Sequence, residues 1–358
     1  MQLIRMITFT DRGYELADRI RDSIPDHIVQ IMDKGQDTDT WVRETFELRI
    51  PLFFISACGI AVRFIAPYVN DKYSDSAVIV ADEAGDYVIP ILSGHLGGAN
   101  RLAKEISEII GAQCVLTTAS DVNGLLAIDV FADINRLIIT DRQGVKRVSS
   151  KLLKTGRITM AIQDGIDFDK DNVPDEVRIV DYPSDMDISG LKQVHEHDKT
   201  DVIISYDGSA SEYAALHLKP ADYVLGIGCK KGTSTEDIDE VVRSGIEASG
   251  VAITQDDIAT VASIDLKAAE TGLLRFAATL GIPFITYSAD SLNEVEGDFT
   301  GSGFVKEITG VDNVCERAAL LCAGSIGTAA TLILRKYAYN GVSVAMARAD
   351  KRIIRWTK

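Results

Sequence analysis

A histidine stands inside a glycine-rich stretch, Leu92-Ser93-Gly94-His95-Leu96-Gly97-Gly98-Ala99-Asn100. Histidine titrates near neutral pH, so it is suited to proton transfer. Glycines let the backbone approach a ligand closely, and the free N–H groups at a helix start favour negative charge. The stretch therefore predicts either an anion site with a general base beside it, or an ordinary turn whose glycines only permit tight packing. Neither a Walker loop nor a GxGxxG fingerprint fits its spacing.

The flanking sequence indicates how this histidine is positioned. Residues 87–91 are apolar and β-branched, as in a strand, and residues 101–110 carry apolar side chains at helical spacing. Gly111 stands where a helix commonly ends. The sequence thus predicts a strand, a glycine-rich turn and a helix.

Other polar residues of the first half follow apolar runs of strand length at residues 52–57, 77–81 and 114–118. In open α/β sheets, ligands bind outside the carboxyl ends of the strands. We therefore expect one site in this half. Its candidate residues at or just after strand ends are Arg63, Asp82, Glu83, Ser93, His95 and Asp121.

A second candidate anion site follows the strand predicted at residues 223–229, where Lys230 and Lys231 precede a helix start. Thr233 and Glu236 have the spacing of a capping box. Two solvated lysines beside a capped helix explain these residues equally well. Farther along, a cluster at a helix start contains Ser263, Asp265, Lys267 and Glu270, in which Asp265 could be an N-cap and the last two a surface pair.

Composition excludes several classes of protein. The chain has 358 residues and a formal net charge of −16, which disfavours nucleic acid as a partner because phosphates require clustered basic residues. No apolar run is long enough to span a bilayer, and the first residues lack a small-residue cleavage site. The five cysteines are scattered without a CxxC pair, so we expect free thiols, no metal site and a cytoplasmic protein.

Strands that alternate with helices across short turns predict an α/β fold. We expect two three-layer α/β/α domains with parallel or mixed sheets, joined by a smaller α/β middle segment. The predicted boundaries are an N-terminal domain at 1–128, a middle segment at 129–220 and a C-terminal domain at 221–358.

Seven short blocks stand out along the chain. The N-terminal blocks are GIAVR at 59–63, VADE at 80–83, LSGHLGGAN at 92–100 and TTASD at 117–121. The C-terminal blocks are GIGCKKG at 226–232, ASIDLK at 262–267 and GVDNVCE at 310–316. Together these blocks resemble the cobalt-precorrin-5A hydrolases. Their order and spacing fit a full-length member, whereas the first fifty residues and the middle segment match loosely.

The resemblance implies an enzyme of anaerobic cobalamin biosynthesis that acts on cobalt-precorrin-5A. Such an enzyme opens the δ-lactone between the ring A acetate and C20, and then expels C20 with its methyl group as acetaldehyde to leave cobalt-precorrin-5B. No cofactor is implied, because the substrate carries the cobalt. The resemblance is also compatible with a homodimer and with transient contacts to neighbouring enzymes of the pathway. The rival readings are a carrier for a cobalt-tetrapyrrole intermediate and a methyltransferase, for which no adenosylmethionine-binding glycine loop is evident.

For this reaction we expect His95 to be the general base, with Glu83 or Asp82 orienting it or sharing its proton. The N–H groups around Gly97 and Gly98 would stabilise an oxyanion or hold a propionate. The site is expected between the two α/β domains, because a large flat substrate needs a wide cleft. Its cationic residues would be Arg63, Lys72, Lys230, Lys231 and Lys267; the other expected substrate contacts are Ser93, Gly94, Asn100, Asp121, Ser263 and Glu270.

Overall fold

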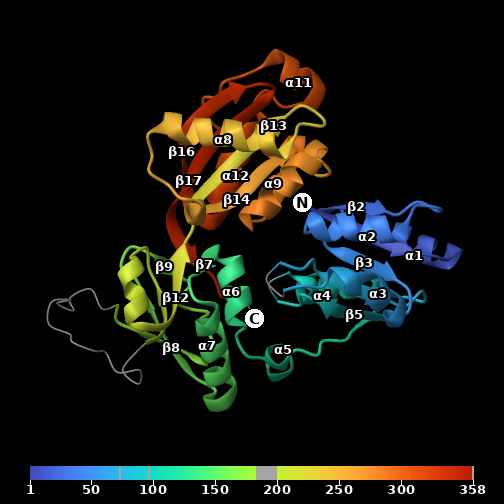
Figure 1. Ribbon diagram of the computed structural model, residues 1–358. Helices are drawn as coiled ribbons and strands as arrows, with labels where there is room; N and C mark the ends of the chain where they lie inside the picture. Colours follow the sequence, from blue (N-terminus) through green and yellow to red (C-terminus); the bar gives the residue numbers. More distant parts are fainter. Residues whose placement is uncertain (72–73, 96, 183–199, 357–358) are drawn as a thin grey trace.

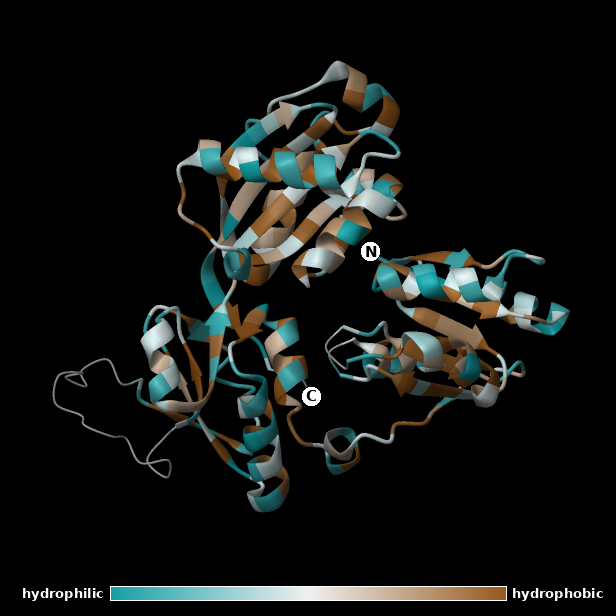
Figure 2. Cartoon of the chain, viewed as in Figure 1, coloured by the Kyte–Doolittle hydropathy of each residue, from teal (hydrophilic) through white to brown (hydrophobic). Residues whose placement is uncertain are grey.

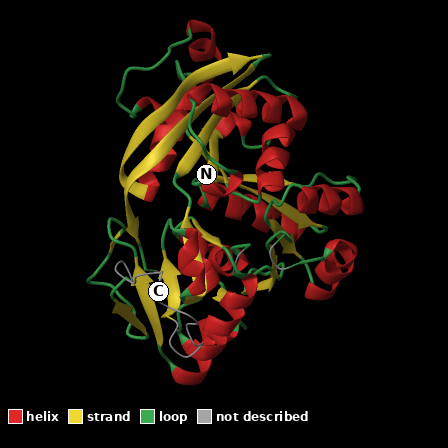
Figure 3. Cartoon of the chain, turned by 60° about the vertical axis from the view of Figure 1, so that its left-hand side comes forward, coloured by secondary structure: helices red, strands yellow, loops and turns green. Residues whose placement is uncertain are grey.

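Three separate β-sheets follow one another along the chain in the computed structural model, which describes residues 1–71, 74–95, 97–182 and 200–356. Figure 1 shows the N-terminal sheet in blue and teal, the middle sheet in green to yellow and the C-terminal sheet in yellow to red. Figure 3 shows helices packed against the strands in each of the three parts. The predicted α/β class with mixed sheets is confirmed.

The N-terminal sheet has the strand order β2-β1-β3-β4-β5-β6. Its first four strands are parallel, β5 runs antiparallel to β4, and β6 is parallel to β5. The reversal at β5 decides which edge of the sheet carries the glycine-rich turn. The strands are β1 (Gln2–Thr8), β2 (His27–Ile31), β3 (Leu52–Ile55), β4 (Val78–Ala81), β5 (Tyr87–Leu92) and β6 (Gln113–Cys114).

Helices cover both faces of this sheet, which makes three layers. One face packs against α1 and α4, and the other against α2 and α3. Because both faces are buried, strand β3 is an unbroken apolar run, and it is brown in Figure 2. The helices are α1 (Asp11–Ser23), α2 (Thr38–Glu47), α3 (Cys58–Ile65) and α4 (Ala99–Ile110), followed by the short α5 (Ala119–Asn123).

The middle sheet has the order β10-β8-β11-β12-β7, with only β7 antiparallel to its neighbour. Helices α6 and α7 pack on one of its faces. The elements are α6 (Ile128–Ile134), β7 (Leu137–Ile139), α7 (Arg142–Thr155), β8 (Ile158–Ile162), β10 (Val177–Val180), β11 (Thr200–Ile204) and β12 (Ala214–Pro220); β9 (Asp167–Phe168) pairs instead with β17 of the C-terminal sheet.

The C-terminal sheet has the order β15-β14-β13-β17-β16, with α8 and α9 on one face and α12 on the other. Strands β13, β14 and β15 are parallel, so their carboxyl ends lie at one edge. The elements are β13 (Tyr223–Cys229), α8 (Thr235–Ser249), β14 (Ile258–Ile264), α9 (Thr271–Leu280), β15 (Phe284–Tyr287), α10 (Ala289–Asn293), α11 (Gly303–Thr309), α12 (Val314–Ile326), β16 (Gly327–Tyr339) and β17 (Val342–Ile354).

Two local expectations are wrong. The cap of α8 is Ser234, whose Oγ accepts the N–H of Asp237, because the helix begins one residue later than the Thr233 pattern indicates. Asp265 does not cap a long helix: it begins a single 3-10 turn, and α9 starts only after Glu270.

The N-terminal and C-terminal domains touch through the start of the chain. The N-terminal ammonium of Met1 donates to the carbonyl oxygen of Thr286, and the Thr286 N–H donates to the carbonyl oxygen of Met1. Beside these bonds, Leu3, Leu48 and Ile50 pack against Leu274 of α9. This contact places the amino ends of β1, β3 and β4 near the C-terminal domain.

Candidate active site

The glycine-rich turn is held by its own backbone. Ser93 has φ 52° and Gly98, the N-cap of α4, has φ 80°. The N–H of Gly98 donates to the His95 carbonyl oxygen, and the N–H of Asn100 donates to the Gly94 carbonyl oxygen. A Cβ on Gly97 would lie 2.5 Å from Ser93 Cβ, so only glycine fits there. The Gly98 N–H is already used within the turn, which contradicts its expected role as an oxyanion donor.

His95 lies between two carboxylates. Its Nε2 is 3.3 Å from Asp121 Oδ2, and its Nδ1 is 3.3 Å from Asp129 Oδ1. The hydrogen bond to Asp129 raises the pKa of His95, and Asp121 adds to this effect against the opposing effect of burial. A ring with an acceptor at each nitrogen is most stable as the doubly protonated imidazolium.

Asp121 is itself fixed by three side chains around it. It accepts hydrogen bonds from Thr118 Oγ1, from Asn100 Nδ2 at 2.8 Å and from Lys104 Nζ at 3.1 Å. Burial alone would raise the pKa of Asp121, but the hydrogen bonds from Thr118 and Lys104 outweigh it and the pKa is lowered. This carboxylate therefore stays ionised beside His95.

The expected pairing of His95 with Glu83 or Asp82 is wrong. Because β5 is antiparallel to β4, Leu92 pairs with Val78 at the start of β4, whereas Asp82 and Glu83 follow its end. Three residue steps of strand separate the two edges by about 10 Å. At the far edge, Glu83 accepts the hydroxyl of Thr10, and Asp82 accepts the N–H of Tyr87.

The remaining candidates of the N-terminal half are dispersed. Arg63 is exposed on α3, which follows the carboxyl end of β3 and so belongs to the same far edge as Glu83. Lys72 lies outside the described residues. The hydroxyl of Ser93 is buried without a hydrogen-bond partner among the residues described, directly before the turn.

The candidates of the C-terminal half gather at the carboxyl edge of that sheet. Glu270 accepts the N–H of Gly232 at 2.7 Å and the ammonium of Lys267 at 3.2 Å, so it ties this loop to the neighbouring strand end. Lys230 and Lys231 are exposed on the same loop. Ser263 is fully buried and donates to the Ile227 carbonyl oxygen, which contradicts its expected contact with substrate.

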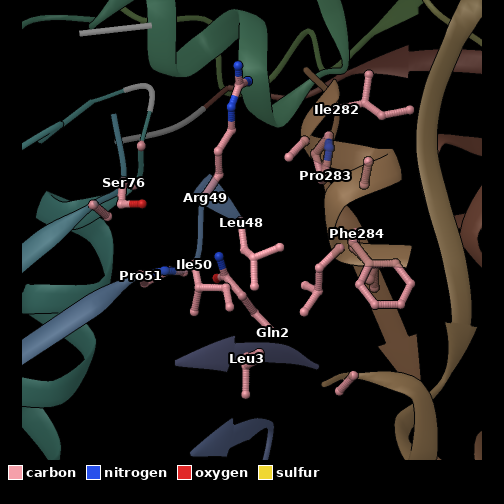
Figure 4. A pocket seen from close by; sticks show the side chains of 18 of the residues that line it. Gln2, Leu3, Leu48, Arg49, Ile50, Pro51, Ser76, Ile282, Pro283 and Phe284 are labelled. Carbon is pink, nitrogen blue, oxygen red and sulfur yellow. The ribbon is translucent and has the colours of Figure 1, made fainter. Parts of the chain in front are cut away.

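Two cavities of about 470 Å³ each flank the glycine-rich turn. One is lined by His95 and Asp129 together with α7 of the middle domain, including Lys146 and Ser149. The other lies between the N-terminal and C-terminal domains, and Gly97 and Gly98 are part of its wall. Figure 4 shows this second cavity, with Ile50 and Pro51 opposite Pro283 and Phe284.

Helix α6 connects the two cavities. Asp129 in its first turn contacts His95, and Asp133 one turn later lines the interdomain cavity. Residues four apart lie on one helix face with a rise of about 6 Å between them. The reacting centre can therefore be shared by the two cavities.

Sequence reasoning missed Asp129 and Lys104, and it missed three arginines of the interdomain cavity: Arg49, Arg101 and Arg136. Lys104 and Arg101 could have been identified from the sequence, because they lie on the first turns of the helix that begins at the motif. Asp129 carried no local signal except that it is an acidic residue at a helix start.

Two features are absent from the described residues. These residues contain no group of three or more His, Cys, Asp or Glu side chains placed to hold a metal ion. Within the same residues, no helix combines the length and the apolar character that a membrane span requires.

Comparison with known proteins gives the family. The family model described as "Cobalamin synthesis G N-terminal" matches residues 40–121, and "Cobalamin synthesis G C-terminus" matches residues 223–347. The cobalt-precorrin-5A hydrolase of Salmonella typhimurium is 36% identical over 284 residues, which cover 78% of each chain. That of Priestia megaterium is 31% identical over 96% of this chain and 94% of its own, and a probable one of Methanocaldococcus jannaschii is 28% identical over 96% and 98%. The chain therefore belongs to the cobalt-precorrin-5A hydrolase family and is a hydrolase of cobalamin biosynthesis.

Proposed function

We propose that this chain converts cobalt-precorrin-5A to cobalt-precorrin-5B by opening the ring A lactone and releasing acetaldehyde. The observation that carries the proposal is the 36% identity to a cobalt-precorrin-5A hydrolase over 78% of both chains. No cofactor is needed in this scheme, because the cobalt belongs to the substrate. Homodimer formation and contact with neighbouring pathway enzymes stay predictions.

The first step is attack of water on the lactone carbonyl. Asp129, which lines the cavity beside His95, takes one proton from the attacking water. The tetrahedral intermediate collapses, and the bond between the carbonyl carbon and the C20 oxygen breaks. His95, whose pKa is raised by its two carboxylate neighbours, gives its proton to the departing oxygen. A cationic donor suits this step better than the neutral base expected from the sequence.

The second step uses the same histidine in its neutral form. His95 takes the proton back from the C20 hydroxyl, the bond from C20 to the macrocycle breaks, and its electron pair moves into the ring system. Acetaldehyde leaves, and the macrocycle gains a proton from Asp129. The net reaction of the two steps consumes one water and releases one acetaldehyde. One imidazole thus serves both steps, with Asp121 holding its orientation.

The test is acetaldehyde release from cobalt-precorrin-5A under anaerobic conditions, with heat-killed protein as the blank. Wild-type protein should release one equivalent. His95→Gln should lower the rate by about 10²- to 10⁴-fold, whereas Glu83→Gln at the far edge of the sheet should stay near wild type. Tight substrate binding with no acetaldehyde would instead support a carrier, and an unchanged rate for His95→Gln would overturn the assignment of this residue.

A further inference from the structure

The wall of the interdomain cavity combines apolar and charged side chains. Leu274, Ile282, Pro283 and Phe284 of the C-terminal domain are apolar, and the charged side chains are Arg49, Arg101, Arg136, Asp26, Asp75, Glu105 and Asp133. In Figure 4, Arg49 extends into the space between Ser76 of the N-terminal domain and Ile282 and Pro283 of the C-terminal domain. A cavity of this kind matches a ligand with an apolar body and negatively charged edges.

The acidic side chains of the cavity wall already have partners. Glu105 lies 3.0 Å from His27 Nε2, and Asp133 lies 3.1 Å from Arg136 Nη1. Asp75 accepts the N–H groups of residues 70 and 71. Burial lowers the pKa of the Met1 ammonium, and the nearby negative charge of Asp26 opposes this effect.

Two arginines of the cavity wall, in contrast, form no ion pair with the described residues. Within the described parts of the chain, no carboxylate lies within ion-pair distance of Arg49 or Arg101. Arg49 occupies a left-handed conformation, φ 52°, which is costly for a side chain of this size. Arg101 lies in the first turn of α4, three residues after Gly98. The two guanidinium groups therefore come from different elements to the same cavity.

We propose that Arg49 and Arg101 are a carboxylate-binding pair that holds the charged rim of a tetrapyrrole in the interdomain cavity. The proposal rests on the proposed function, because the substrate of that reaction carries several peripheral carboxylates. A guanidinium binds a carboxylate through two parallel hydrogen bonds, which fixes its direction as well as its position. The bound ring would then lie against the glycine-rich turn, next to His95.

The test measures binding without turnover. The probe is uroporphyrin, a tetrapyrrole with eight carboxylates, and its fluorescence anisotropy is titrated with the full chain. Each of Arg49→Gln and Arg101→Gln should raise the Kd about tenfold, as expected for one lost charged contact, and the double variant should lose most of the salt dependence. Both side chains are exposed, so thermal unfolding should be unchanged.

The matched control is Arg19→Gln, an exposed arginine of the same domain whose guanidinium lies near Gly85 at the far edge of the sheet. Its Kd should equal that of wild type. A wild-type chain that does not bind uroporphyrin, or a Kd unchanged in both variants, would overturn the proposal. Because no acetaldehyde is measured, a chain that binds the probe through these arginines but does not turn over substrate would contradict the proposed function alone.

Discussion

His95 Nδ1 lies 3.3 Å from Asp129 Oδ1, and this contact joins the glycine-rich turn of the N-terminal domain to the first turn of α6 in the middle domain. Figure 1 shows that α5 lies on the connection between these two parts. The candidate catalytic residue His95 thus contacts a carboxylate that comes from outside its own domain. The middle domain contributes to the site, and its exact placement affects the protonation of His95.

Asp129→Asn should lower the pKa of His95, because it removes the neighbour that raises this pKa most. The measurement is the pH titration of the imidazole resonances by NMR. The control is Asp133→Asn, one turn farther along α6 and paired with Arg136 rather than with the imidazole. If Asp129→Asn and Asp133→Asn gave the same His95 pKa as wild type, the contact would have no electrostatic role.

The stability contributed by His95 should depend on pH. The pKa of His95 in the folded state is raised above its unfolded value, so its contribution is complete below about pH 6.5 and is lost as the pH rises through the folded pKa. Urea unfolding of wild type and His95→Gln should therefore differ more at pH 5.5 than at pH 9. A difference that grows with pH would contradict this sign.

Gly97→Ala should distort the turn and lower turnover while the domain stays folded. The new Cβ would lie 2.5 Å from Ser93 Cβ and 2.8 Å from the Ser93 carbonyl oxygen, so the backbone before His95 must shift. A displacement of this order commonly costs about 10²-fold in rate. Gly59→Ala is the matched control, because nothing lies within 4 Å of its added Cβ and alanine suits its helical position in the first turn of α3. Equal rates for the two variants would show that the turn geometry is not required.

Arg352→Met should destabilise the junction of the middle and C-terminal domains by about 3–5 kcal/mol, because it leaves the buried carboxylate of Asp222 without its cationic partner and with only the Tyr206 hydroxyl as a side-chain donor. Arg352 Nε donates to Asp222 Oδ1 at 2.7 Å, and its other nitrogens donate to the carbonyl oxygens of Asn135 and Ala221. The measurement is thermal or urea unfolding.

The control for that junction is Arg348→Met on the same strand, whose ion pair with Asp350 is partly solvated. It should cost no more than about 1 kcal/mol. A comparable loss in both variants would mean that the buried network around Arg352 adds nothing beyond a surface pair.

Much of the local structure could be predicted from the sequence, because it depends on residues that are neighbours in the chain. The apolar run at 87–91, the glycines at 94, 97 and 98 and the helical spacing after residue 100 are realised as β5, the turn and α4, which ends at Gly111 as predicted. The α/β class follows in the same way from the alternation of strands and helices. Where a helix start depended on one cap residue, as at Thr233 and Ser234, the prediction was wrong by one position.

The tertiary structure decided which residues form the site. A strand's residue pattern is the same in both directions, so the side-chain pattern did not show that β5 runs opposite to β4 and carries His95 away from Glu83. One signal was present: only residues 82–86 separate β4 from β5, too few for a parallel crossover. His95 contacts Asp129, and Arg49 and Arg101 line one cavity with residues of the C-terminal domain, although these segments are far apart in the chain. Such contacts depend on how whole domains pack, and for this reason only the three-dimensional structure could assign them.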